Sequence, residues 1–249
     1  MDLSDNTILI TGGATGIGLE LARQLLDLGN EIIICGRREE KLSEAKKNFP
    51  RLHTYACDLS KRDERITFVN TVIADFPRLN ILINNAGIQN QFDLTSEISS
   101  EDIENEIATN LIAPIHLSSL FISHLPGKNN SAIINVTSGL GFVPLAIVPV
   151  YCSTKAALHS YTMSLRHQLK ETSIKVFEIA PPTVDTNLDR GAREKRGMVD
   201  RGISAVECAA LMIKAIEEDR FFAPIGQAEN LVGAVSSGKA DLVFGRMNG

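Results

Sequence analysis

Tyr151 and Lys155 are the residues whose types and spacing in this sequence point most directly to proton transfer. They lie four residues apart, so on a helix their side chains share one face. A phenol is a weak acid at pH 7, because its reference pKa is about 10. A neighbouring ammonium favours the phenolate, so the pair predicts a Tyr151 pKa lowered into the range that serves proton transfer. Such a pair also arises by chance, and its weight comes from Ser138, which follows the apolar run 132–136.

Short apolar runs alternate with longer amphipathic stretches along the chain. The predicted strands are 7–10, 31–35, 52–56, 81–83, 132–136 and 175–179. The predicted helices are 16–28, 39–48, 61–76, 100–124, 150–171 and 204–218, the last with Ser204 as its N-cap. The strands are continuously apolar, which is typical of parallel strands covered by helices on both faces. We therefore expect an α/β fold, a single-domain, doubly wound parallel sheet whose ligands bind beyond the carboxyl ends of the strands.

A glycine-rich turn follows the first predicted strand and opens the first predicted helix. In Thr11-Gly12-Gly13-Ala14-Thr15-Gly16-Ile17-Gly18, Gly12 permits a tight turn and Gly16 lets the backbone approach a pyrophosphate. Gly18 lets the helix pack near the strand, and the helix start offers free N–H groups and a positive dipole to phosphates. The alternative is an ordinary turn, but the strand-turn-helix context favours dinucleotide binding.

The second predicted strand ends in Gly36-Arg37-Arg38. A cofactor with a free ribose 2′-hydroxyl usually meets Asp or Glu about 20 residues past the glycines, and Gly36 stands there instead. Two guanidiniums offer bidentate, permanently charged donors to a 2′-phosphate, which favours NADP, with NAD as the alternative. Arg37 and Arg38 could also be solvated residues at a helix start, although arginine there is unfavourable without an anion nearby.

Several motifs occur together in one order along about residues 7–186. They are the glycine turn 11–18, Asn84-Asn85-Ala86-Gly87, Asn110, Ser138 and Tyr151-Cys152-Ser153-Thr154-Lys155. This combination resembles the short-chain dehydrogenase/reductase family. Within that family, the stretches 148–152, 156–160 and 165–169 are most similar to a bacterial branch found with lipoteichoic-acid D-alanylation operons. The resemblance implies a Rossmann fold and an oxidoreductase acting on CH–OH or C=O groups with NADP or NAD.

The resemblance also implies a catalytic set of Ser138, Tyr151 and Lys155, assisted by Asn110. Tyr151 would exchange a proton with the substrate oxygen, which Ser138 would hold by a hydrogen bond. Lys155 would bind the nicotinamide ribose hydroxyls and lower the Tyr151 pKa. Asn110 would use its side chain or its backbone carbonyl to hold a water that links Lys155 to solvent. In plainer interpretations, Ser138 caps a turn and Asn110 bonds to a helix neighbour.

Further cofactor contacts follow from the same resemblance. Asp58 would accept from the adenine amino group, Asn85 would brace the central strands, and Val184 and Thr186 would clamp the nicotinamide carboxamide. The expected cofactor-binding residues are Gly12, Thr15, Gly16, Ile17, Gly18, Arg37, Arg38, Asp58, Leu59, Asn85, Ala86, Gly87, Tyr151, Lys155, Val184 and Thr186. Two residues depart from the family pattern. Pro182 replaces a usual glycine and stiffens the turn, and Thr15 stands where NADP-preferring members often carry a basic residue.

The composition argues against several other classes of protein. A chain of 249 residues with 44% hydrophobic and 22% charged residues suits one folded α/β domain. Its net charge of -5 argues against nucleic-acid or anionic-membrane partners. We expect no membrane span and no signal peptide, because no apolar run is long enough and none follows a basic start. The four cysteines lack metal-ligand spacing and the helical histidines do not converge, so we expect reduced thiols, no metal and a cytoplasmic location.

The remaining segments concern substrate and assembly. The apolar stretch 139–149 predicts a substrate wall beside Ser138. Residues 187–202 have no clear periodicity and predict a substrate lid or a surface loop, and 226–249 predicts a C-terminal tail, packed or flexible. Helices 100–124 and 150–171 are apolar on more than one face, which favours a homodimer or homotetramer, although burial against the chain's own sheet explains part of this pattern.

The function that these features favour is an NADP(H)-dependent oxidoreductase that moves hydride between nicotinamide and a carbonyl or secondary alcohol of a small molecule. Two alternatives stay open: a catalytically silent, dinucleotide-sensing regulatory protein, and a non-redox relative such as an epimerase or dehydratase. The presence of all three of Ser138, Tyr151 and Lys155 favours the enzyme. Neither fold nor family identifies the substrate.

Overall fold

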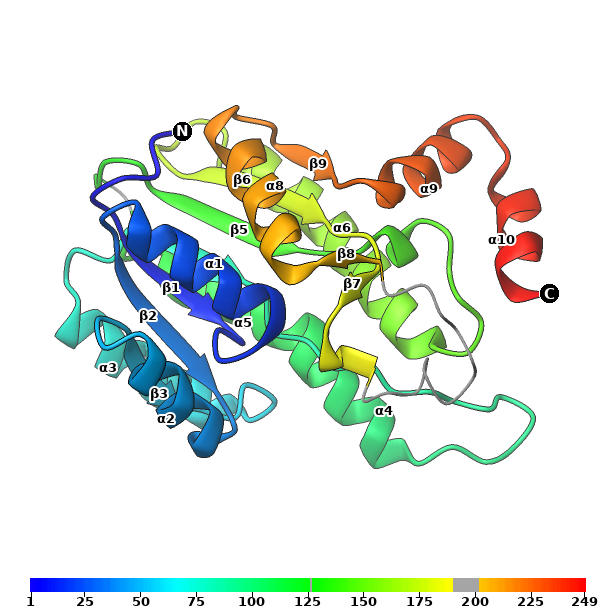
Figure 1. Cartoon of the computed structure of the whole chain (residues 1–249), viewed down its shortest axis with the longest axis horizontal. Helices are drawn as coiled ribbons and strands as arrows, with labels where there is room; N and C mark the ends of the chain where they lie inside the picture. Colours follow the sequence, from blue (N-terminus) through cyan, green and yellow to red (C-terminus); the bar gives the residue numbers. More distant parts are fainter. Residues whose placement is uncertain (126, 190–201) are drawn as a thin grey trace.

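The centre of the molecule is a parallel β-sheet. Within the residues that the computed structural model describes, 1–125, 127–189 and 202–249, seven strands form this sheet in the order β3-β2-β1-β4-β5-β6-β9 (Figure 1). The strands are β1 (Thr7–Thr11), β2 (Glu31–Gly36), β3 (His53–Ala56), β4 (Ile81–Asn84), β5 (Ala132–Val136), β6 (Lys175–Ala180) and β9 (Phe222–Pro224). The strand order reverses between β1 and β4, the point at which open α/β sheets bind ligands.

Helices cover both faces of the sheet. One core cluster joins the sheet to α1 (Gly16–Asp27), α2 (Glu39–Asn48) and α8 (Ala205–Glu217). The other joins it to α3 (Arg62–Asp75), α5 (Ala113–Ile122) and α6 (Pro149–Gln168). The doubly wound α/β fold predicted from the sequence is therefore confirmed.

Alternate residues of each strand face opposite helix layers. Ile8 and Ile10 belong to the cluster under α1, whereas Leu9 belongs to the cluster on the other face. This is the period of two that a strand imposes on its side chains. Because both faces are covered, every residue of β1, β4 and β5 is buried, which explains why these strands are continuously apolar in sequence.

Each predicted strand and helix is present, and the differences have local causes. The predicted helix 100–124 is divided into α4 (Ser100–Ile107), the π-helical turn η1 (Ala108–Ile112) and α5. Strand β9 was not predicted, because three residues ending in Pro224 are too few to show a period. The short pair β7 (Val184–Asp185) and β8 (Ile203–Ser204) was missed for the same reason.

The predicted tail, 226–249, is helical. It forms α9 (Gln227–Ser236) and α10 (Ala240–Asn248), and α10 lies at the margin of the molecule beside the loop that follows β5 (Figure 1). The glycine and serine residues that suggested a flexible tail lie within and between these helices. The predicted lid, 187–202, falls mostly outside the described residues, apart from the 3-10 turn Asn187–Asp189 and Gly202.

Candidate active site

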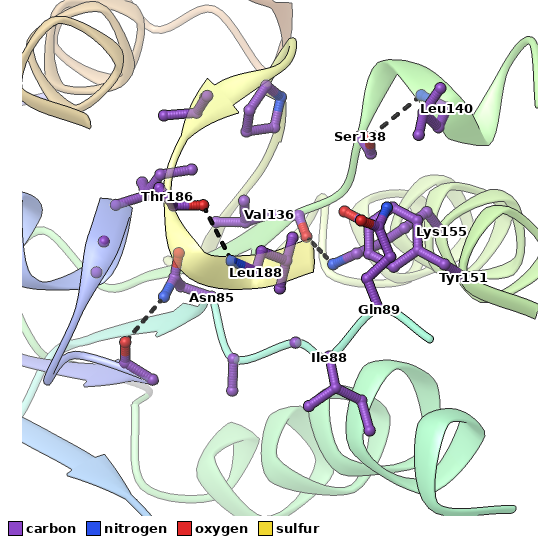
Figure 2. A pocket seen from close by; sticks show the side chains of 18 of the residues that line it. Asn85, Ile88, Gln89, Val136, Ser138, Leu140, Tyr151, Lys155, Thr186 and Leu188 are labelled. Atoms are coloured by element: carbon purple, nitrogen blue, oxygen red, sulfur yellow. Dashed lines mark hydrogen bonds between the residues drawn. The ribbon is translucent and has the colours of Figure 1, made fainter. Parts of the chain in front are cut away.

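A cleft of about 1240 Å³ opens at the carboxyl ends of the strands. Its walls are the turn after β1, the loops after β2 to β6, and the start of α6. Figure 2 shows the part of the cleft formed by the segments after β4, β5 and β6 and by α6. Every residue expected to bind the cofactor lines this cleft, as does Ser138. Asn110 does not line it, but it is fully buried and bonded to Ile88, which does.

Glycines shape the turn between β1 and α1. Gly12 and Gly16 have φ angles of +66° and +57°, a region that other residues rarely adopt. A Cβ on Gly18 would lie 2.4 Å from the Gly12 carbonyl oxygen, so the helix start packs directly on the turn. Thr15, the N-cap of α1, makes no side-chain capping bond, and the described first helical turn carries no acidic residue. Its amide groups are therefore available to an anion, which fits the phosphates of a dinucleotide.

Thr11 ties the ends of β1 and β4 together. Its hydroxyl oxygen accepts from the backbone N–H groups of Asn85 and Ala86, both at 3.0 Å. The Asn85 amide donates to the Thr11 carbonyl oxygen at 2.9 Å, which is the bracing contact expected of Asn85. Thr11 itself was not predicted as a site residue, although its place at the end of a buried strand was a visible signal.

Cationic side chains gather at the end of β2. Arg37 and Arg38 are exposed and line the cleft together with Lys41 of α2, which was not predicted. The Arg38 guanidinium donates to the Thr15 hydroxyl at 3.3 Å and so joins this loop to the glycine turn. Lys41 pairs with Glu44 at 2.7 Å, whereas no ion pair involves Arg37 or Arg38 within the described part of the chain. Two guanidiniums thus remain for an external anion.

Asp58 and Leu59 form the wall beyond β3. The Asp58 Oδ1 accepts from the Ser60 N–H at 3.0 Å and from the Ser60 hydroxyl at 2.8 Å. The Lys61 Nζ lies 4.0 Å from Oδ2. The carboxylate is therefore held by its own turn, with the buried apolar side chain of Leu59 beside it. A flat, partly apolar base that carries an amino group suits such a wall.

The predicted carboxamide clamp lies directly against the glycine turn. The Thr186 Cγ2 lies 3.2 Å from the position of a Cβ on Gly16, and the Thr186 hydroxyl accepts from the Leu188 N–H at 3.4 Å (Figure 2). Val184 is buried in β7, which pairs with β8 despite the preceding Pro182. Both clamp residues therefore stand within reach of a ligand held by the turn.

Tyr151 and Lys155 come from the first turns of α6, and Ser138 comes from the segment directly after β5 (Figure 2). All three side chains are buried, and the Tyr151 phenol shares a hydrogen bond with Ser138. The Lys155 Nζ donates to the Val136 carbonyl oxygen at 2.8 Å and lies 5.7 Å from the centre of the Tyr151 ring. Phenol, hydroxyl and ammonium thus converge at one end of the cleft.

Burial determines the protonation states of this pair. It raises the pKa of Tyr151 to about 12, and the hydrogen bond with Ser138 opposes only part of that rise. It lowers the pKa of Lys155 to about 8. The predicted lowering of the Tyr151 pKa is therefore wrong, because removal from water disfavours the charged form of each group and is the largest cause of both shifts. At pH 7 Tyr151 is a neutral phenol with a proton to donate.

Asn110 lies in η1, a π-helical turn of the kind often found at functional sites. Its side-chain oxygen accepts from the Ile88 N–H at 2.9 Å, and its amide donates to the Ile88 carbonyl at 2.8 Å. The same amide donates to the Thr154 hydroxyl at 3.3 Å. The side chain is thus engaged in holding the segment after β4 against α6. Of the two groups predicted to hold a water, the backbone carbonyl is the one left for that role.

An apolar wall flanks the chemical end of the cleft. It comes from the loop after Ser138, from α9 and from α10, and consists of Leu140, Leu145, Ile147, Val148, Leu231, Val243 and Met247. The Asn248 side-chain oxygen accepts from the Ala146 N–H at 2.6 Å, and its amide donates to the Pro144 carbonyl at 3.3 Å. These bonds fasten the last helix to the loop, a contribution of the C-terminus that was not predicted.

Other kinds of site find little support in the part of the chain that the structure describes. There, no group of His, Cys, Asp or Glu side chains is arranged to hold a metal ion. Cys35, Cys57, Cys152 and Cys208 are buried free thiols. Among the helices described, none has both the length and the apolar character needed to cross a membrane.

Fold and cleft together have the organisation of a dinucleotide-dependent dehydrogenase. A sequence profile described as short chain dehydrogenase matches residues 6–197. That stretch contains the sheet through β6 and every residue predicted to be catalytic. The chain belongs to the short chain dehydrogenase family and is an oxidoreductase.

Individual proteins show which members of the family the chain resembles. The chain is 46% identical to the uncharacterized oxidoreductase DltE of Bacillus subtilis, over 249 residues covering 100% of this chain and 98% of that protein. This match confirms the predicted resemblance to the bacterial branch. A short chain dehydrogenase from Burkholderia cenocepacia, solved with NADP, superposes with a TM-score of 0.85 at 22% identity, covering 99% of both chains. One from Burkholderia phymatum, solved with NAD, gives 0.87 at 20% identity, covering 98% of this chain and 96% of that one. These two structures confirm the fold.

Proposed function

We propose that this protein is an NADP(H)-dependent carbonyl reductase, with a single dinucleotide-binding domain, that acts on a small molecule. The observation that carries the proposal is the convergence of Ser138, Tyr151 and Lys155 at one end of a cleft whose other end presents free helix amides. The glycine turn and the segment after β4 would hold the pyrophosphate and the adenine ribose, with Val184 and Thr186 at the carboxamide. Bound there, NADP(H) supplies the hydride.

The preference for NADP rests on Arg37 and Arg38. Both residues line the cleft and lack a carboxylate partner among the described residues, and the Arg38 guanidinium contacts Thr15. An additional phosphate on the ribose would meet them, whereas a free hydroxyl has no acidic partner at Gly36. The relatives solved with NADP and with NAD support a nicotinamide dinucleotide of either kind.

The proton chemistry follows from the protonation states. Tyr151, a neutral phenol, donates its proton to the carbonyl oxygen as hydride reaches the carbonyl carbon, which yields the alcohol and a phenolate. The Lys155 ammonium and the Ser138 hydroxyl stabilise that phenolate. A water held by the Asn110 carbonyl would return the proton from solvent. At pH 7 Tyr151 is therefore in the protonation state that reduction requires.

The test is NADPH oxidation, followed by absorbance, with a panel of aldehydes and ketones. Tyr151→Phe is the matched control, since it removes only the phenolic oxygen. Turnover in the wild type and loss in the variant support the reductase. Tight NADP binding without turnover would indicate the sensing protein instead, and a changed substrate without net NADPH consumption would indicate an epimerase or dehydratase. A parallel titration with NADH measures the cofactor preference.

We further propose that the protein is a cytoplasmic homodimer or homotetramer. Ile112 in η1 and Met163 on α6 are apolar and exposed, 47% and 54% respectively, and a second subunit would cover them. Four free thiols accord with a reducing compartment. Light scattering checks the assembly, and a mass equal to the 27.1 kDa chain would contradict it.

A further inference from the structure

A fully buried carboxylate lies behind the catalytic residues. Glu178 of β6 has an exposed fraction of 0%. The His159 Nδ1 lies 2.9 Å from Oε1 and 2.8 Å from Oε2 of Glu178, and the Thr137 hydroxyl donates to Oε1 at 2.9 Å. A buried carboxylate without partners is strongly destabilising, so these two contacts, together with the nearby positive charge of Arg166, stabilise Glu178 inside the sheet.

Both partners of Glu178 belong to elements that carry catalytic groups. His159 lies on α6, four residues beyond Lys155 and eight beyond Tyr151, which places the three side chains along one stripe of the helix. Thr137 directly precedes Ser138, and its N–H donates to the Ile179 carbonyl at 2.8 Å. Glu178 thus connects the helix that carries Tyr151 to the strand end that carries Ser138.

The loop after Ser138 packs on the same imidazole. The ring centres of Phe142 and His159 are 4.7 Å apart in an edge-to-face arrangement. Phe222 of β9 contacts the imidazole from another direction, with ring centres 5.6 Å apart. These rings restrict the orientation of His159 and leave its side chain 27% exposed. The imidazole is therefore a packing centre for α6, the loop and the edge of the sheet.

We propose that His159, Glu178 and Thr137 form a positioning cluster that sets the distance between Ser138 and Tyr151. The cluster exchanges no proton with substrate and acts through the two elements that it joins. A displacement of about 1 Å at a reacting group can lower a rate on the order of 100-fold, so its loss reduces turnover and leaves cofactor binding intact. The expected loss of turnover rests on the proposed function. The expected change in the surroundings of Tyr151 can be measured without turnover.

The kinetic test compares two substitutions at one position. His159→Leu removes the donor, and His159→Asn keeps an N–H close to the place of Nδ1. His167→Leu is the matched control, because His167 lies two turns further along α6 and is exposed. We expect His159→Leu to lower kcat by about 10- to 100-fold with the KM for NADPH within about twofold, His159→Asn to recover most of the loss, and the control to match the wild type.

Two kinetic results would overturn the proposal: an unchanged kcat in His159→Leu, or equal losses in His159→Leu and His159→Asn. Should His159→Leu fail to fold, Thr137→Val tests the same cluster. It replaces the Thr137 hydroxyl with a methyl group and leaves the side-chain volume nearly unchanged. It is expected to lower kcat several-fold with KM for NADPH unchanged, and a wild-type kcat in that variant would count against the cluster.

A spectroscopic test needs no substrate. The chain contains three tyrosines, so labelling with 3-fluorotyrosine gives three fluorine signals, and Tyr151→Phe assigns one of them. We expect His159→Leu to shift the Tyr151 signal and to leave that of Tyr55, on β3, in place. An unmoved Tyr151 signal overturns the positioning role. If the Tyr151 signal moves but the wild-type protein reduces no carbonyl compound of the panel, the positioning cluster is supported and the proposed function is overturned.

Discussion

The nucleotide end of the cleft is formed mainly by backbone, whereas the chemical end is formed mainly by side chains. At the nucleotide end the backbone forms the site: Gly12 and Gly16 adopt positive φ, and a Cβ on Gly18 would collide with a carbonyl oxygen. At the chemical end buried side chains form the site, and Tyr151 and Ser138 come from different elements. The nucleotide end is therefore determined by local sequence, whereas the chemical end depends on how distant segments pack.

The largest expected effect separates the two ends. Tyr151→Phe removes the proton donor, and general acid catalysis contributes about 100- to 10,000-fold. We therefore expect kcat to fall by about 1000-fold, while the Kd for NADPH, measured by fluorescence titration, stays within about twofold. A variant that keeps its turnover, or that loses NADPH binding to the same extent, would show that the two ends are not independent.

A substitution at the nucleotide end is expected to weaken NADPH binding. In Gly18→Ala the new methyl meets the Gly12 carbonyl and the Asn85 amide at 2.4 and 2.6 Å. Overpacking of this kind costs about 1–3 kcal/mol, so we expect a lower Tm and an NADPH Kd raised about 10-fold. Gly233→Ala is the control, because Gly233 of α9 does not line the cleft and a Cβ there meets nothing within 4 Å. Similar NADPH affinities in the two variants would contradict a backbone-shaped site.

This difference also explains what could be predicted from the sequence. The glycines of residues 11–18 predict the turn after β1, and the alternation of apolar runs with amphipathic stretches predicts the sheet. By contrast, the contribution of α9 and α10 depends on the contacts of Asn248 with a loop about a hundred residues away, and no local pattern encodes it. The direction of the Tyr151 pKa shift was missed because its largest cause is burial, which spacing does not reveal.

Burying Lys155 at the chemical end of the cleft lowers the free energy of unfolding. Burial lowers its pKa from 10.5 to about 8, so at pH 7 the folded protein carries a charge that the unfolded chain accommodates more easily. We expect Lys155→Met to abolish turnover and to raise the free energy of unfolding at pH 7 by about 1–3 kcal/mol. Denaturant titration measures this change.

The pH dependence of that gain has a definite sign. Between about pH 8 and 10.5 the unfolded chain binds a proton that the folded protein has released, so wild-type stability rises relative to Lys155→Met. The difference should therefore shrink across this window. A gain that does not change with pH, or a less stable variant at pH 7, would contradict the burial account of Lys155.

The smallest effect concerns the phosphate specificity of the nucleotide end. Arg38 is exposed, and an exposed charge contact contributes roughly 1 kcal/mol. We expect Arg38→Ala to raise the Kd for NADPH about fivefold and to leave that for NADH unchanged, in calorimetric titrations of both. Arg62→Ala, on α3 and away from the cleft, is the matched control. Equal weakening of both cofactors would place Arg38 at the shared pyrophosphate and not at a 2′-phosphate.

The pH profile of carbonyl reduction tests the neutral-phenol account most directly. The ammonium form of Lys155 is present below its pKa of about 8 and is lost above it, whereas Tyr151 keeps its proton until about pH 12. The kcat/KM for the carbonyl substrate, with saturating NADPH, is therefore expected to be level below about pH 8 and to fall above it. A rate that instead rises through this range, as a phenolate forms, would contradict the account.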